Sequence, residues 1–410
     1  MLLLAGLVCI FYLSTMRKGQ GWMDDYAQYV LHAANIADGK PYKLSGYIFN
    51  PAYPFIGPVT YPPVFPLLLA PVYKAADLDL QAMKAETILF FSVFLYILFL
   101  LFTETLPGWQ PLILAGLIGF NPVFWKFKDY LYSEYVFLFF SFAALYAFGR
   151  ARAAEDSGGR WKAQALSAGV LLYLAYGTRS VGALAGLAFI AADLLDCKKF
   201  SKTLLTACGA ALCLAAVQNL TLHSDAVYVE QARSWFAETP FFTVLLNNIR
   251  DYPGRFAQLF GNGYLSPPAW LLLAATAALA AAGFLARLRK KVSTLEIYAV
   301  LNSLVLLACP AADGLRYGFP LVPFLFYYAF HGWERISGSR PGLRRAGPAL
   351  ILALLFSYAG AYSKAQYGGF REGTDNPETV RLFDYLRSGT LPADVVIFRS
   401  SPLFDSFAPV

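Results

Sequence analysis

Long apolar runs occupy most of this 410-residue chain and constrain its fold more than any other feature. Hydrophobic residues make up 58% of the sequence and charged residues 14%, whereas soluble globular domains have roughly 45–50% apolar and about 25% charged residues. So little polar surface cannot enclose a water-soluble body, and most of the exterior must therefore face lipid. The sequence predicts an all-α polytopic membrane protein.

About eleven stretches of the chain approach the roughly 20 apolar residues that a membrane-spanning helix needs. We therefore expect about eleven transmembrane helices, with a large loop after the first of them. The stretches are residues 2–15, 83–102, 111–124, 135–148, 166–176, 181–195, 204–220, 269–286, 297–311, 317–332 and 346–362.

The polar C-terminal segment differs in composition from the rest of the chain. This contrast predicts a membrane body, residues 1–362, and a tail, residues 363–410. Within the tail we expect a helix at 378–387 and a strand at 394–398, and hence a small α/β unit.

The net charge of +7 is concentrated in the short segments between the apolar stretches. Cytoplasmic loops carry an excess of Lys and Arg, so the short basic loops should face the cytoplasm and the longer segments, 16–82, 221–268 and 363–410, should lie outside. The basic excess is thus a topology signal, and we expect no nucleic-acid partner. The cations of the short loops are Arg150, Arg152, Arg160, Lys162, Lys198, Lys199, Lys202, Arg287, Arg289, Lys290, Lys291, Arg335, Arg340, Arg344 and Arg345.

Residues 166–195 form one apolar run whose only charge before Asp193 is Arg179. As a single helix this run would be about 45 Å long, which is too long for one untilted crossing. Basic loops flank it on both sides, so both of its ends should be cytoplasmic. We therefore expect two crossings with a break at Gly177-Thr178-Arg179, which places Arg179 near the outer membrane surface.

Two adjacent carboxylates, Asp24 and Asp25, follow the first apolar stretch and open a helical pattern that ends near Ala37. Acidic residues at a helix start commonly cap the helix and complement its dipole. Neighbouring side chains on a helix point about 100° apart, so one aspartate can cap while the other faces a cavity. A divalent metal that bridges Asp25 and His32 is a further alternative, because the two fall on one helix face. The sequence indicates no other cofactor.

A proline-rich segment, Tyr-Pro-Pro-Val-Phe-Pro-Leu-Leu-Leu from Tyr61 to Leu69, comes near the end of the first long loop. Its prolines prevent a regular helix at its start. We expect a rigid loop that leads into a short apolar segment lying in, rather than across, the membrane. A purely structural entry turn is the alternative.

The order of these motifs resembles the GT-C class of polyprenyl-phosphate-sugar glycosyltransferases, and within it the protein O-mannosyltransferases and the lipid A aminoarabinose transferases. Besides the aspartate pair and the Tyr61 segment, the resemblance covers motifs spread over residues 1–362. These are Ala33…Gly39…Tyr42, Asn121-Pro122, Tyr132-Ser133-Glu134, Thr178-Arg179 and Arg316-Tyr317-x-x-Pro320-x-x-Pro323.

The chain departs from the pattern of these families at three positions. Asp25 stands where the class commonly has a glutamate. In the aminoarabinose branch a cation lies at the position of Gln28, and a lysine lies at the position of Tyr61. The partners of the lipid phosphate should therefore differ from those of that branch.

The resemblance implies an inverting transfer of a sugar from a polyprenyl-phosphate donor to an acceptor hydroxyl on a lipid, a glycan or a protein. The reaction would take place at the extracytoplasmic face of the plasma or inner membrane. It needs a base near the acceptor and fixed positive charge near the departing phosphate. The resemblance implies Asp24, as the base, and Asp25 as catalytic residues. The substrate-binding residues are then Tyr61, Lys126, Lys128, Glu134, Arg179, Arg316 and Tyr317.

Two other functional classes share many of these features. A transporter also has many spans and charges within the membrane, but it commonly shows inverted repeats with broken helices in matched positions. An O-antigen ligase or polymerase also needs cations on the outer face, but we would expect its large loop late in the chain. The long first loop with its carboxylates favours the glycosyltransferase.

Overall fold

The computed structural model describes residues 1–21, 25–44, 60–222, 233, 235–261, 266–310, 314–340, 342, 344–370 and 373–391. Every regular element within these residues is helical, as the composition predicts. The α-helices are α1 Leu2–Ser14, α2 Tyr26–Ala37, α3 Val64–Ala76, α4 Leu80–Thr103, α5 Gln110–Gly119, α6 Pro122–Phe127, α7 Glu134–Asp156, α8 Lys162–Thr178, α9 Ala183–Cys197, α10 Lys202–Leu222, α12 Phe241–Ala257, α13 Pro267–Lys290, α14 Thr294–Ala308, α15 Val322–Ser339, α16 Ala346–Ser363 and α17 Pro377–Gly389. Three short 3₁₀ turns join them: η1 Ser180–Gly182, η2 Gln258–Phe260 and η3 Arg316–Leu321.

Each predicted apolar stretch overlaps an α-helix, although 181–195 and 317–332 begin in the 3₁₀ turns η1 and η3 and 111–124 forms two helices. The helices α5 and α6 meet at Asn121, whose side chain accepts a hydrogen bond from the Val123 amide at 2.9 Å. Pro122 occupies the first turn of α6, where its missing N–H costs nothing. A new helix therefore starts at Asn121, and the expectation of one continuous helix here is wrong.

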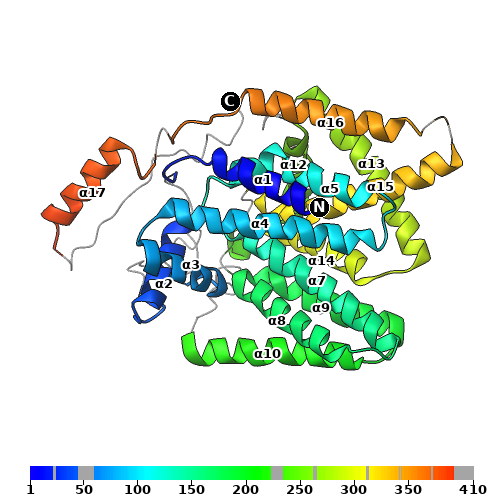
Figure 1. Cartoon of the computed structure of the whole chain (residues 1–410), viewed down its shortest axis with the longest axis horizontal. Coiled ribbons are helices and arrows are strands. Elements are labelled where there is room, and N and C mark those ends of the chain that lie inside the picture. Colours follow the sequence, from blue (N-terminus) through cyan, green and yellow to red (C-terminus); the bar gives the residue numbers. More distant parts are fainter. Residues whose placement is uncertain are drawn as a thin grey trace.

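Five described helices are long and apolar enough to cross a membrane: α4, α7, α10, α13 and α16. The helices α1, α3, α5 and α14 are apolar but shorter. Long helices such as α4, α10 and α16 run nearly parallel across the body (Figure 1). The described part of the chain is thus that of an all-α membrane protein, and the number of eleven crossings stays a prediction.

The break predicted inside the run 166–195 is present. Helix α8 ends at Thr178, Arg179 has an extended backbone (φ −148°, ψ 131°), and α9 begins after η1. A Cβ on Gly182 would collide with the backbone of Ala175, so the glycine allows the chain to return closely beside α8. Arg179 therefore lies at the tip of a helical hairpin.

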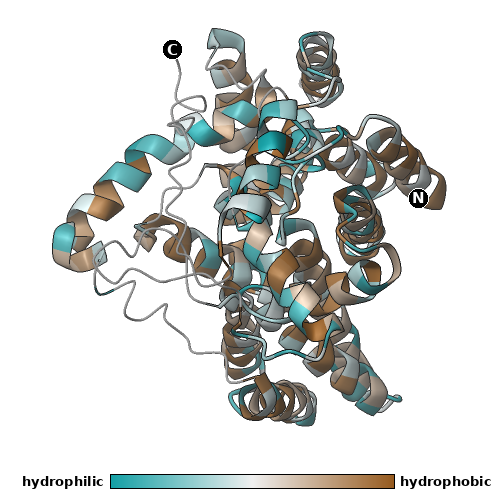
Figure 2. Ribbon diagram, turned by 90° about the vertical axis from the view of Figure 1, so that its left-hand side faces the viewer, coloured by the Kyte–Doolittle hydropathy of each residue, from teal (hydrophilic) through white to brown (hydrophobic). Residues whose placement is uncertain are grey.

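The interior contains two clusters of buried hydrophobic side chains. The larger one joins α1, α4, α5 and α7 to α13, α14 and α15. The smaller one contains Tyr29 and Val30 from α2, Phe65 and Leu69 from α3, and Val136 from α7. Brown, apolar residues dominate many of the packed helices, whereas α17 alternates between teal and brown (Figure 2). The smaller cluster fixes α2 and α3 against α7.

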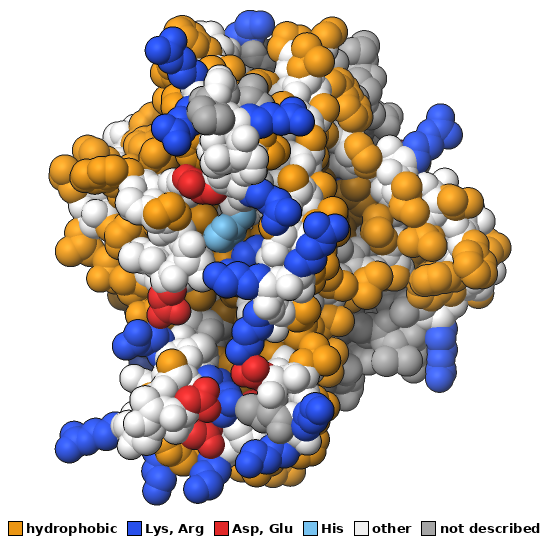
Figure 3. All heavy atoms as spheres, turned by 90° about the vertical axis from the view of Figure 1, so that its right-hand side faces the viewer, with side chains coloured by type: hydrophobic (Ala, Val, Ile, Leu, Met, Phe, Trp, Pro, Cys, Tyr) orange, Lys and Arg blue, Asp and Glu red, His pale blue; other side chains and the backbone are white. Residues whose placement is uncertain are grey.

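Basic side chains are grouped at one end of the molecule. The helices α2, α3 and α17 lie at the left end in Figure 1. Lys and Arg side chains gather over the opposite end, which faces the viewer in Figure 3. The basic loops identified in the sequence therefore lie together, at the end opposite α2 and α3 (Figure 1).

The described part of the tail contacts the segment that follows α1. The Arg17 guanidinium donates hydrogen bonds to the carbonyls of Gly368 (2.6 Å) and Gly369 (2.8 Å), and it lies over the Phe370 ring. The Thr374 amide donates to the Gln20 carbonyl at 2.9 Å. Helix α17 matches the expected tail helix, while the expected strand at 394–398 lies outside the described residues. The division into body and tail remains a prediction.

Close packing of α13 on α15 gives a first testable prediction. A Cβ on Gly283 would collide with the carbonyl of Tyr328, whereas a Cβ on Gly209 of α10 would meet nothing within 4 Å. Overpacking a tight contact typically costs about 1–3 kcal/mol. We expect Gly283→Ala to lower the apparent melting temperature of the detergent-solubilised protein, and the matched Gly209→Ala to leave it unchanged or raise it. Equal melting temperatures would contradict the contact.

Candidate active site

Asp25 lies directly before α2, and its side chain makes no capping hydrogen bond to that helix. Instead, one carboxylate oxygen accepts a hydrogen bond from the Tyr61 hydroxyl at 2.5 Å. The other lies 3.5 Å from a terminal nitrogen of Arg316. The capping explanation therefore does not account for Asp25. Asp24, the predicted base, lies outside the described residues.

Tyr61 is held from several directions. Its ring centroid lies 4.7 Å from that of Tyr29, and its carbonyl accepts a hydrogen bond from the Tyr42 hydroxyl at 2.8 Å. The Tyr42 ring stacks on His32, and the Tyr42 carbonyl lies 2.9 Å from the His32 Nδ1. After Tyr61 the chain enters α3 at Val64. The proline-rich segment thus delivers the Tyr61 hydroxyl to Asp25.

Arg316 opens the 3₁₀ turn η3 and is only 8% exposed. Besides Asp25, its guanidinium lies 3.8 Å from a Glu134 oxygen. The guanidinium carbon is 5.2 Å from the Tyr132 ring centroid and 5.3 Å from that of Tyr317, distances typical of cation–π contacts. Arg316 is therefore placed between two carboxylates and two aromatic rings.

Glu134, the first residue of α7, forms a buried ion pair with Arg179. The distance between them is 2.6 Å, and Glu134 has a side-chain exposure of only 4%. Arg179 also donates a hydrogen bond to the Ser133 hydroxyl at 3.3 Å and lies 5.4 Å from the Tyr317 ring centroid. The tip of the α8–α9 hairpin is thereby tied to the start of α7.

Six of the predicted site residues therefore meet in one place. They come from segments that are far apart in the sequence and bring two carboxylates together with two guanidinium groups. We call this group the Asp25 cluster; its members are Asp25, Tyr61, Glu134, Arg179, Arg316 and Tyr317.

Sequence reasoning missed the part played by Tyr29. Its hydroxyl lies 3.4 Å from the Ser133 hydroxyl, next to the Asp25 cluster. Burial, together with the nearby Asp25 charge, raises the pKa of Tyr29 well above its usual value, so its hydroxyl stays protonated. Tyr29 follows Asp25 by four residues, a spacing that places the two on one side of α2. This four-residue spacing is the feature of the sequence that could have indicated the position of Tyr29.

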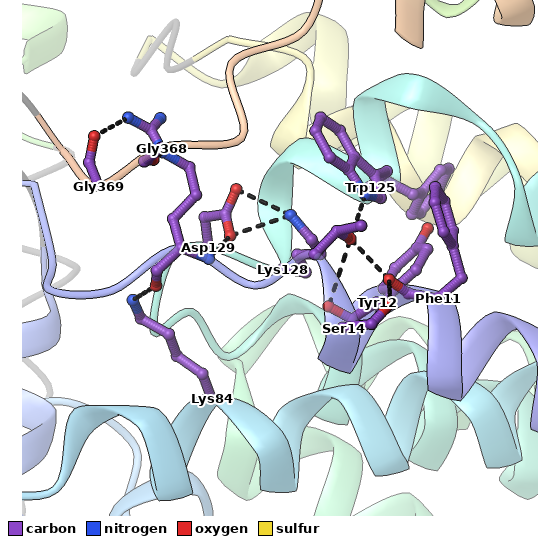
Figure 4. A network of polar contacts seen from close by, with 12 residues as sticks. Phe11, Tyr12, Ser14, Lys84, Trp125, Lys128, Asp129, Gly368 and Gly369 are labelled. Carbon is purple, nitrogen blue, oxygen red and sulfur yellow. Dashed lines mark hydrogen bonds and ion pairs between the residues drawn. The ribbon is translucent and has the colours of Figure 1, made fainter.

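The structure does not bring Lys126 and Lys128 to the Asp25 cluster. Lys128 is buried, pairs with Asp129 at 2.9 Å and lies 3.8 Å from the Trp125 ring centroid. The Asp129 carboxylate also accepts a hydrogen bond from the Arg17 amide at 2.8 Å, close to Lys84 (Figure 4). Burial lowers the pKa of Lys128 to about 8, although Asp129 acts in the opposite direction. Lys126 is exposed at the end of α6.

The geometry does not favour a metal held between Asp25 and His32. The seven residues that separate them correspond to about 10 Å along a helix axis, which is too far for two ligands of one ion. His32 is buried and contacts the Tyr42 carbonyl, and burial lowers its pKa. Among the described residues no group of three His, Cys, Asp or Glu side chains could hold a metal ion.

Comparison with solved structures identifies proteins with the same arrangement of helices. The chain is similar to the archaeal oligosaccharyltransferase AglB from Archaeoglobus fulgidus, solved in complex with an inhibitory peptide and a dolichol-phosphate (TM-score 0.57, 17% identity over 96% of this chain). It is also similar to the apo form (TM-score 0.56, 18% identity, 96%). A third structure, tethered to an acceptor peptide, gives a TM-score of 0.54 at 16% identity over 94% of the chain. The fold is of the GT-C class.

The matched region covers 58% of each of these oligosaccharyltransferase chains. No protein-family model matches the sequence. No relative was found among curated proteins. The likeness therefore establishes the fold predicted from the motif order.

The Glu134–Arg179 pair gives a second testable prediction. Removing one partner of a buried pair leaves the other charge unpaired, at a cost of about 3–5 kcal/mol. We expect Arg179→Gln and Glu134→Gln each to destabilise the protein strongly, and the double variant to lose much less than the sum of the two. Unfolding in detergent with increasing dodecyl sulfate measures the three free energies.

The exposed pair Arg150–Glu104 is the matched control. Its two groups are 3.5 Å apart, but their side chains are 54% and 52% exposed. Surface pairs contribute about 0–1 kcal/mol, so the same double-variant cycle should show little coupling there. Equal coupling in the two cycles would contradict the importance of the buried pair.

Proposed function

We propose that the chain is an integral-membrane, inverting glycosyltransferase that moves a sugar from a polyprenyl-phosphate donor to an acceptor hydroxyl at the extracytoplasmic face. The observation that carries the proposal is the Asp25 cluster, which combines carboxylates with buried guanidinium groups in a GT-C fold. One neighbouring oligosaccharyltransferase was solved with a dolichol-phosphate, a polyprenyl phosphate, which supports a donor of this kind.

Arg179 and Arg316 are the proposed partners of the donor phosphate. Both guanidinium groups are largely buried, and a charge-assisted hydrogen bond to phosphate is strongest where water is excluded. Each arginine already faces a carboxylate, Glu134 or Asp25, so it is held in place before the donor arrives. The donor phosphodiester would then share these arginines with the carboxylates.

Asp24 is the proposed general base, and Asp25 the residue that orients Arg316. Both oxygens of Asp25 are engaged, one by Tyr61 and the other by Arg316, which suits a positioning role. Asp24 is the neighbouring residue in the chain.

The proposed step conserves the charge of the site. The acceptor oxygen attacks the anomeric carbon, and its proton passes to the Asp24 carboxylate. The bond between the anomeric carbon and the phosphate oxygen breaks, and the electron pair leaves with the lipid phosphate. The phosphate gains negative charge as the carboxylate loses it, so fixed arginines can stabilise the transition state without rearranging.

Substitution of the two aspartates tests this assignment. General-base assistance is worth about 10²–10⁴ in rate, so Asp24→Asn should lower transfer by a factor in that range. Asp25→Asn should cost less, because the neutral amide still reaches Tyr61. The measurement is release of lipid phosphate by the purified protein from a panel of polyprenyl-phosphate sugars.

Asp38→Asn is the matched control, because Asp38 lies in the same loop and forms a surface pair with Lys40. It should leave the rate unchanged. Near-normal turnover in Asp24→Asn with an inactive Asp25→Asn would assign the base to the other neighbour. Full activity in both variants would remove this loop from the chemistry and refute the proposed function.

We further propose that the protein resides in the plasma or inner membrane, with the Asp25 cluster outside and the basic loops in the cytoplasm. The supporting observation is the gathering of Lys and Arg side chains over the end opposite α2, α3 and α17 (Figures 1 and 3). The donor lipid and the acceptor, a lipid, a glycan or a protein, would then meet at the outer membrane surface.

Thiol labelling tests this topology. In a chain whose native cysteines are replaced by alanine, single cysteines at Lys40 and Arg387 should react with an impermeant maleimide in intact cells. A single cysteine at Lys199, in a basic loop, should react only after the cells are permeabilised. All three positions are exposed. Labelling at Lys199 in intact cells, or protection at Lys40, would contradict the proposed orientation.

A further inference from the structure

A hollow of about 220 Å³ with a mixed polar and apolar lining lies beside α12, in the second long segment that we place outside. It is larger than a water site but smaller than the roughly 300–1,000 Å³ of pockets for drug-sized ligands, a size that suits a single ring. The lining residues are Trp235, Glu238, Thr239, Val244, Asn247, Asn248, Asp251 and Pro310.

The lining has the chemistry of a carbohydrate site. An indole offers a flat apolar surface for the C–H face of a sugar ring, and carboxylate, amide and hydroxyl groups accept and donate the hydrogen bonds that sugar hydroxyls make. The described lining residues include two carboxylates, Glu238 and Asp251, and neither lysine nor arginine. This charge disfavours a lipid phosphate and suits a sugar that carries no negative charge.

Hydrogen bonds and helix contacts connect the hollow to the Asp25 cluster. Asn248 in its wall donates hydrogen bonds to the carbonyls of Leu307 (2.9 Å) and Cys309 (2.8 Å), which fixes the end of α14. Helix α14 also contacts η3, the turn that carries Arg316. Glu134, the one cluster residue of α7, lies 3.8 Å from Arg316 in η3. The turn η3 therefore contacts both α14 and the proposed donor site.

We propose that this hollow binds one sugar ring of a glycan acceptor. The inference rests on the proposed function and narrows its acceptor to a carbohydrate. A ring bound between Trp235 and Asp251 anchors the acceptor on the α12–α14 side of η3. Another hydroxyl of the same glycan then reaches the anomeric carbon of the donor, whose phosphate lies at Arg179 and Arg316.

Direct binding of simple glycosides tests the site. The probes are the methyl glycosides of mannose, glucose, galactose and N-acetylglucosamine, titrated into the detergent-solubilised protein and followed by saturation-transfer NMR. We expect saturable binding of at least one probe. Trp235→Ala and Asp251→Asn should each weaken it about tenfold or more. Absence of saturable binding for all four probes would overturn the proposal.

Trp109→Ala is the matched control, because Trp109 is 76% exposed and lies outside the hollow. It should bind the probe like the unchanged protein, and an equal loss in this variant would overturn the proposal. Asp251 is exposed at the surface of α12, so Asp251→Asn should keep the fold and the melting temperature. If Trp235→Ala fails to fold, glycoside binding to the Asp251→Asn variant still tests the site.

A kinetic measurement separates this inference from the proposed function. With a glycan acceptor, Asp251→Asn should raise the KM for the acceptor and leave the KM for the polyprenyl-phosphate sugar unchanged. An unchanged acceptor KM, with donor turnover still dependent on Asp24, would refute the acceptor site and retain the glycosyltransferase. Glycoside binding at the hollow without turnover of any donor would refute the glycosyltransferase and retain the sugar site.

Discussion

The buried ion pair between Glu134 and Arg179 is the contact on which the rest of the Asp25 cluster depends. The same Glu134 oxygen that meets Arg179 also lies 3.8 Å from Arg316. Arg316 meets Asp25, and Asp25 is held in turn by Tyr61. Because an unpaired buried charge costs more than the pair contributes, each member constrains the next. One carboxylate at the start of α7 thereby fixes the positions of four other segments.

Hydrophobic patterning predicted most of the fold, because each apolar run is long enough to specify a helix by itself. The hairpin at Arg179 followed from length and from the basic loops at both ends. The split at Asn121 was not predicted, because a single capping residue changes the hydrophobic pattern of an apolar run very little. The number of crossings is also undetermined by sequence. The helices α5 and α14 are so short that their length does not distinguish a membrane crossing from a buried helix.

The candidate site was predicted best where a charged residue stands in an apolar setting. Arg179 has no compensating charge nearby in the sequence, so its partner had to come from elsewhere in the fold. Arg316 meets Asp25 and Glu134, which are both far from it in the sequence. Lys128 looks equally suitable in isolation, but the adjacent Asp129 and the stacked Trp125 engage it. The hollow at α12 combines residues from 235 to 310, and its existence depends on packing that no local pattern encodes.

The order of the paired charges along the chain has a consequence for biogenesis. Asp25 and Glu134 are both synthesised before the arginines that they meet, Arg179 and Arg316. An arginine at membrane depth costs about 2.5–3.5 kcal/mol during insertion. When the α8–α9 hairpin enters the bilayer, the counter-charge of Arg179 is already present on α7, the helix immediately before it. Arg316 is synthesised last, when Asp25 and Glu134 are already in place. The site can therefore assemble in the order in which its residues are translated.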